Sequence, residues 1–169
     1  MRSFKLLALA LAAPLAVAIV ATAAASPPEQ LQAAKAAAAR YHSVAQAEAA
    51  GYVPAGPCVA SPDGAMGFHW ENPALMADDA LDPLRPEILV YAAKAGGELE
   101  LVAVEYFKSD ADQNLTTDGD RPSLFGQPFD GPMPAHHPGM GVHYDLHVWL
   151  YRDNPSGTFS MWNPDVVCP

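Results

Sequence analysis

Two apolar runs, Glu87-Ile-Leu-Val-Tyr-Ala92 and Leu99-Glu-Leu-Val-Ala-Val-Glu-Tyr-Phe107, indicate how the 169-residue chain folds. Both runs are rich in β-branched and aromatic side chains, which favour strands. Gly96 and Gly97 lie between them, and glycine accepts the positive φ angles that a tight turn requires. We therefore expect a β-hairpin over residues 87–107.

A third strand is predicted over residues 143–151, which read His143-Tyr-Asp-Leu-His-Val-Trp-Leu-Tyr151. Side chains in a strand alternate between the two faces of the sheet, and this run alternates in the same way. Residues 66–70 and 158–162 are shorter candidates, and Asn-Pro pairs near them indicate turns. The long segment 108–140 is rich in Asp, Gly and Pro, which is typical of a functional or flexible loop.

One helix is expected over residues 28–50, where apolar residues recur at helical spacing. Ser26 and Glu29 have the spacing of a capping box, and Gly51 is suited to end the helix. The predicted fold class is therefore α+β: one N-terminal amphipathic helix packed on a curved antiparallel sheet or a small β-barrel.

Residues 1–25 have the three parts of a secretory signal peptide. Arg2 and Lys5 provide the positive charge, an apolar run follows, and an Ala-x-Ala cleavage site precedes Ser26. We therefore expect a single secreted domain over residues 26–169, in the periplasm or outside the cell. Cysteines oxidise in these compartments, so Cys58 and Cys168 are predicted to form one disulfide.

The charge balance excludes several classes of partner. The chain has 19 acidic and 9 basic residues and a formal net charge of −10, which argues against nucleic acid and against an anionic membrane surface. No membrane association is expected after signal cleavage. The sequence also has no P-loop, no Gly-x-Ser-x-Gly and no His-Glu-x-x-His motif. A small-molecule or protein partner remains open.

One face of the strand at residues 143–151 is expected to be polar. Alternation places His143, Asp145 and His147 on this face, opposite the apolar set that would meet the main hydrophobic layer. The segments Met66-Gly-Phe-His-Trp-Glu71 and Met140-Gly-Val-His-Tyr-Asp145 share one pattern, with glycine two residues before histidine and an acid two residues after it. Glycine at that position allows close approach of a neighbouring strand.

These residues predict a metal site. An ionised Glu105 on an otherwise apolar strand face is costly unless it is paired or binds a metal. The candidate ligands are His69, Glu105, His143 and His147, with Asp145 and Glu71 as supporting carboxylates or alternative ligands. His143 and His147 are about 13 Å apart along an extended strand, which is too far for one ion unless the strand bends. A mixed nitrogen and oxygen set suits Zn, Mn, Fe or Cu, and the sequence does not choose among them.

Two functions follow from these expectations. The first is a secreted metal-binding protein, and specifically a mononuclear metalloenzyme acting on a small molecule if the site is catalytic. The second is a non-catalytic, extracytoplasmic module that binds a ligand or partner through an aromatic surface. This surface would contain Trp70, Tyr106, Trp149 and Trp162. In either case His136 and His137 form a solvated surface pair or a lid over the site.

Several motifs are spread over nearly all of the mature chain: Tyr41-His42, Ala49-Ala50-Gly51-Tyr52, Gly67-x-His69, Pro86-Glu87, Val104-Glu105-Tyr106, His143-Tyr-Asp-Leu-His-Val-Trp149 and Trp162-Asn-Pro164. With these motifs the chain resembles a group of secreted bacterial proteins. The resemblance implies a secreted bacterial single-domain protein, and it implies no activity or cofactor. The candidate ligands are also loosely similar to the three-histidine, one-glutamate sets of cupin barrels, although the His-x-His spacing of that family is missing.

Overall fold

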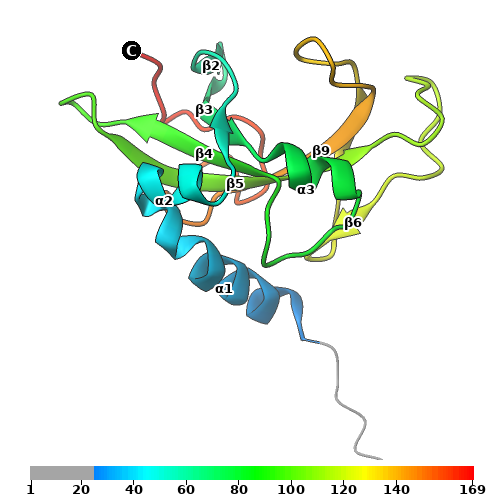
Figure 1. Ribbon diagram of the computed structural model, residues 1–169, viewed down its shortest axis with the longest axis horizontal. Coiled ribbons are helices and arrows are strands. Elements are labelled where there is room, and N and C mark those ends of the chain that lie inside the picture. The colour runs from blue at the N-terminus through cyan, green and yellow to red at the C-terminus, as the bar shows by residue number, and fades with distance from the viewer. Residues whose placement is uncertain (1–24) are drawn as a thin grey trace, which may run out of the picture.

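The computed structural model describes residues 25–169, and an open antiparallel sheet of seven strands forms its centre (Figure 1). The strand order is β1-β3-β4-β5-β9-β8, and β2 pairs with β3 outside this path. The strands are β1 (Val53–Pro54), β2 (Val59–Ser61), β3 (Gly64–Glu71), β4 (Ile88–Ala93), β5 (Leu99–Ser109), β8 (Asp130–Met133) and β9 (His143–Val148), with β6 (Ser123–Leu124) and β7 (Gln127–Pro128) in a separate ribbon. The predicted α+β class and antiparallel sheet are confirmed. The barrel alternative is wrong because the sheet does not close.

The N-terminal helix is shorter than predicted. It comprises α1 (Pro27–Ala38) and the 3-10 turn η1 (Ala39–His42), and a separate helix α2 (Val44–Ala49) follows. Ser43 breaks the predicted helix of residues 28–50 because its backbone is extended, with ψ at 111°. Glu29 accepts a hydrogen bond from the Ser26 N–H at 2.8 Å, as the capping box predicts, and the Ser26 hydroxyl also donates to Glu29 at 2.8 Å. Gly51 ends α2 at a φ of 94°, which confirms its predicted role.

The helices cover one face of the sheet, on the side where α1 and α2 are drawn in Figure 1. Two buried tyrosines fix them there, because the Tyr91 hydroxyl donates to the Tyr41 carbonyl and the Tyr52 hydroxyl donates to the Pro86 carbonyl, each at 2.6 Å. A third helix, α3 (Pro73–Asp78), begins at Asn72, whose side chain accepts two backbone N–H bonds. The main hydrophobic core lies between the helices and this face.

The predicted hairpin of residues 87–107 is confirmed as β4 and β5, but a bulge changes its faces. Val90 is opposite Ala103, whereas Tyr91 is opposite Leu101, so Val102 is the extra residue. Leu101 consequently packs in the helix-side core, while Ala103 packs on the other face. Without the bulge, strict alternation would place both residues on the face of Glu105. The face that carries Glu105 is therefore lined by smaller side chains than the sequence indicates.

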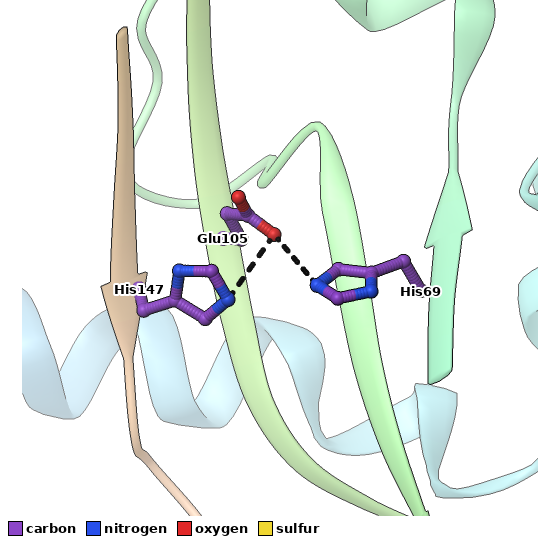
Figure 2. Close-up of side chains that lie close together, drawn as sticks. All are labelled: His69, Glu105 and His147. Carbon is purple, nitrogen blue, oxygen red and sulfur yellow. Dashed lines mark ion pairs between the residues drawn. The ribbon is translucent and has the colours of Figure 1, made fainter. Parts of the chain in front are cut away.

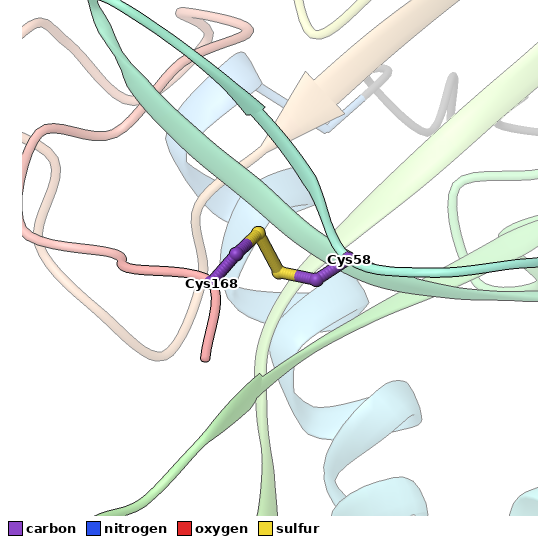
Figure 3. The surroundings of a disulfide bond; sticks show 2 residues. All are labelled: Cys58 and Cys168. Atoms are coloured by element: carbon purple, nitrogen blue, oxygen red, sulfur yellow. A yellow bond between two sulfur atoms is a disulfide. The ribbon is translucent and has the colours of Figure 1, made fainter.

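The second face of the sheet is covered mainly by the C-terminal segment. Val166 packs there with Ala103 and Trp149 in a smaller core. The predicted disulfide between Cys58 and Cys168 is confirmed, and it joins this segment to the start of β2 (Figure 3). The strand predicted at residues 158–162 is wrong, since those residues form turns and only Asn163 pairs with the sheet, at Ala65.

The predicted signal peptide of residues 1–25 lies outside the described part of the chain, apart from Ala25. Within residues 25–169, none of the helices has the length and apolar character needed to cross a membrane.

Candidate metal centre

Three strands place His69, Glu105 and His147 together on the second face of the sheet (Figure 2). Glu105 on β5 is directly opposite His147 on β9. His69 comes from β3, and β4 lies between β3 and β5 without contributing a side chain to the centre. Val90 of β4 is opposite both His69 and Ala103. Because Val90 and Ala103 are short, the His69 ring can extend across β4 toward Glu105.

The three side chains converge on one carboxylate oxygen. Oε2 of Glu105 lies 3.3 Å from Nε2 of His69 and 3.4 Å from Nε2 of His147. Neither contact has hydrogen-bond geometry, and Oε2 of Glu105 and both ring nitrogens of His147 are buried without a hydrogen-bond partner. One atom from each residue lies within 4.8 Å of the other two. Polar atoms that are buried, unpaired and convergent have the arrangement that a metal ion would satisfy.

Burial leaves the histidines of the centre in their neutral form. It lowers the pKa of His69 to about 4 and lowers the pKa of His147 well below its ordinary value. Burial also raises the pKa of Glu105 to about 8. Neutral imidazoles have the free lone pair that a metal requires, whereas Glu105 must lose its proton when a cation binds.

Asp145 adds a second buried carboxylate beside the centre. Burial, and then the neighbouring Glu105 carboxylate, raise the pKa of Asp145 well above its ordinary value. Asp145 is 1% exposed, and neither of its side-chain oxygens has a hydrogen-bond partner. Two adjacent ionised carboxylates are unfavourable in a low-dielectric site, so a divalent cation would stabilise the ionised pair. Asp145 is not one of the three convergent residues, and its predicted role as a supporting carboxylate or alternative ligand stays a prediction.

Glycine 67 allows the strands to approach as the sequence predicts. A Cβ atom added to Gly67 would lie 2.4 Å from the backbone oxygen of Tyr91, and the φ angle of Gly67 is 121°. Only glycine fits this position without moving β4. Gly67 thus positions the part of β3 that carries His69 against the rest of the sheet.

His143 and Glu71 do not join the three convergent residues. The His143 ring stacks on Phe107 with a centroid distance of 5.1 Å, and its Nδ1 lies 3.0 Å from the Gly141 carbonyl. Glu71 instead contacts the His137 ring, with Nε2 at 3.1 Å from both carboxylate oxygens. His143 stands opposite Ser109, four residues along β5 from Glu105, so the extended strand keeps it apart from His147.

The loop between β8 and β9 lies beside the centre. His137 of this loop holds Glu71, and the His136 ring meets the His143 ring edge-on, with a centroid distance of 4.8 Å. The sequence signal for this arrangement is the adjacent histidine pair in a Pro-Ala-His-His-Pro-Gly loop. The pair predicts either a solvated surface pair or a lid. The sequence does not indicate that Glu71 and His143 are its partners.

The predicted aromatic surface is wrong. Trp70, Tyr106 and Trp149 are buried in the two cores, and Trp162 is only partly exposed. The Trp149 indole N–H donates to the Ser160 carbonyl at 2.7 Å, and the Tyr106 hydroxyl donates to the Pro83 carbonyl at 2.7 Å. These side chains stabilise the fold and cannot form a common binding surface.

Two imidazoles and one carboxylate form a ligand set that suits zinc with an open position, or non-haem iron. Comparison with protein-family models, with curated proteins and with solved structures gives no match for this chain. The chemistry of the centre is therefore inferred from its own residues alone.

Proposed function

We propose that the protein binds one divalent transition metal ion through His69, Glu105 and His147. The observation that carries this proposal is the convergence of both Nε2 atoms on Oε2 of Glu105, at 3.3 and 3.4 Å. A structural ion pair would not account for it, because burial disfavours protonated imidazoles and an ionised carboxylate at the same position.

The ion is one of Zn, Mn, Fe or Cu. The histidine nitrogens favour these metals over Ca²⁺ and Mg²⁺, which prefer oxygen ligands. Three protein ligands leave coordination positions for water or a substrate atom. The activity that such a centre supports is Lewis-acid or redox chemistry on a small molecule. His147 is fully buried and the His69 side chain is only 12% exposed, so a large substrate would not reach the ion.

We also propose that the protein works in the periplasm or outside the cell. The disulfide between Cys58 and Cys168 supports an oxidising compartment. The predicted signal peptide and the resemblance to secreted bacterial proteins support the same location. A net charge of −10 supports a partner other than nucleic acid or an anionic membrane.

The test is metal binding at equilibrium, measured by calorimetry with Zn²⁺ on the wild-type protein and on His69→Ala. His69 is suited to this test because it is the partly exposed ligand, so its removal leaves the core intact. We expect about one ion per chain and an affinity at least about 100-fold weaker in His69→Ala. The matched control is His42→Ala, which removes an exposed histidine on the helix side of the sheet. Equal affinity in all three proteins would overturn the proposal.

A further inference from the structure

The buried centre raises the question of how an ion reaches it. His147 and Glu105 have side-chain exposures of 0% and 5%, whereas His69 is 12% exposed. An ion must therefore approach from the side of His69. Glu71 lies two residues along β3 from His69, on the same face, and its contact with His137 holds the loop between β8 and β9 on this side.

His136 of this loop and His143 of β9 form a second pair of imidazoles, on the same face of the sheet as the centre. His136 is exposed, and its ring centroid lies 4.8 Å from that of the buried His143. Nδ1 of His143 lies 3.0 Å from the Gly141 carbonyl, which can only accept a hydrogen bond. Nδ1 must therefore donate, and Nε2 of the neutral ring keeps a free lone pair.

The surroundings favour the neutral form of both imidazoles. Partial burial, and then the imidazoles of His69 and His137, lower the pKa of His136, while the Glu71 carboxylate raises it. Burial also lowers the pKa of His143. His136 in turn contributes to the lowered pKa of His147. His136 adjoins His137, whose ring contacts Glu71 two residues along β3 from His69, so this loop lies on the His69 side of the centre. Two neutral imidazoles at the rim of an acidic site have the chemistry to capture a borderline metal ion such as Cu²⁺ or Zn²⁺.

We propose that His136 and His143 form an outer docking position, which captures a divalent transition metal ion and passes it to the buried centre. The inference rests on the proposed function, since the outer pair has a purpose only if the centre binds metal. It assigns a role to His143, which the sequence predicted as a ligand of the centre and the structure separates from it. A docking position speeds both loading and release, so it changes rates and leaves the final affinity unchanged.

The experiment measures the rate of Cu²⁺ loading by stopped-flow quenching of tryptophan fluorescence. Trp149 is a suitable reporter because it follows His147 by two residues on the same face of the sheet. His136→Ala and His136→Gln are compared with the wild type, and His42→Ala is the control for loss of an exposed histidine. Because His136 is exposed, both of its variants should fold. The equilibrium affinity of each protein for Cu²⁺ is measured in parallel by dialysis.

We expect the second-order loading rate of both His136 variants to fall about tenfold or more, with the affinity unchanged. The control should load at the wild-type rate. Loading of both variants at the wild-type rate, in a protein that binds Cu²⁺ at equilibrium, would overturn the docking position alone. Absence of Cu²⁺ binding by the wild type at equilibrium would overturn this inference, and absence of Zn, Mn and Fe binding as well would also overturn the proposed function.

Discussion

Replacing Glu105 with glutamine should stabilise the metal-free protein and destabilise the metal-loaded protein relative to wild type. Glutamine has the shape of glutamate but carries no charge at any pH. The variant therefore removes the buried acid and the anionic ligand together. The two effects have opposite signs, so the variant should be the more stable protein without metal and the wild type the more stable protein with metal.

The size of the first effect follows from the pKa of Glu105, which burial raises from 4.5 to about 8. At pH 7 the unfolded chain carries an ionised carboxylate, whereas the folded protein must hold it protonated. The difference costs the wild type about 3 kcal/mol of unfolding free energy at pH 7. Because the folded pKa of Glu105 is raised, the wild type is most stable below pH 4.5, where this carboxyl is protonated in both the folded and the unfolded state. The wild type loses this stability as the pH rises through 8. Glu105→Gln should therefore be about 3 kcal/mol more stable than wild type at neutral pH without metal.

The second effect is the stabilisation of the wild type by its ligand. An ion at a thousandfold excess over its dissociation constant adds about 4 kcal/mol to the free energy of unfolding. Glu105→Gln lacks the charged ligand and should gain little. With excess Zn²⁺ the wild type should accordingly become the more stable protein.

Urea unfolding at pH 7, once with a chelator and once with Zn²⁺, measures both effects. A repeat with chelator near pH 4 should show the two proteins converging, because Glu105 is then protonated in both states. The reasoning is refuted if Glu105→Gln is less stable than wild type in chelator at pH 7. It is also refuted if Zn²⁺ stabilises both proteins equally.

Three further predictions concern the rest of the site and its support. Gly67→Ala should lower the free energy of unfolding by about 3 kcal/mol, since the new Cβ would lie 2.4 Å from a backbone oxygen of β4 at a φ of 121°. Gly96→Ala is the control in the same urea titration, because its Cβ would meet nothing within 4 Å, and equal losses would contradict the argument. Replacing Cys58 and Cys168 together with alanine should cost up to about 4 kcal/mol by urea unfolding, because the bridge spans 110 residues, and an unchanged midpoint would contradict this. Zn²⁺ affinity, measured by calorimetry, should fall about tenfold for each pH unit below 8, because the proton on Glu105 must leave as the ion binds, and a flat profile would count against its role as a ligand.

Local pattern was sufficient to predict much of the fold. Alternation in residues 143–148 correctly separated Tyr144, Leu146 and Val148, which pack in the main core, from the polar set on the other face. The capping box at Ser26 and the stop at Gly51 were also predictable, because each depends on residues within one helical turn. Such features need no knowledge of distant contacts.

The choice among the predicted ligands was not predictable in the same way. Whether His143 or His147 meets Glu105 depends on the register between β5 and β9, which is a long-range property. The bulge at Val102 is invisible to a periodic pattern, and it changes the face on which Leu101 lies. Closure of the sheet into a barrel is likewise decided by pairing of distant edges, so the sequence left it open.

The most direct test of the account is the metal content of the purified protein, determined by elemental analysis after incubation with Zn, Mn, Fe or Cu and removal of free ions. The comparison protein carries His69→Ala and His147→Ala, and circular dichroism establishes that both are folded. The account predicts about one ion per chain in the wild type and almost none in the double variant. A folded wild-type protein that retains none of the four metals, or a double variant that retains as much as wild type, would contradict it.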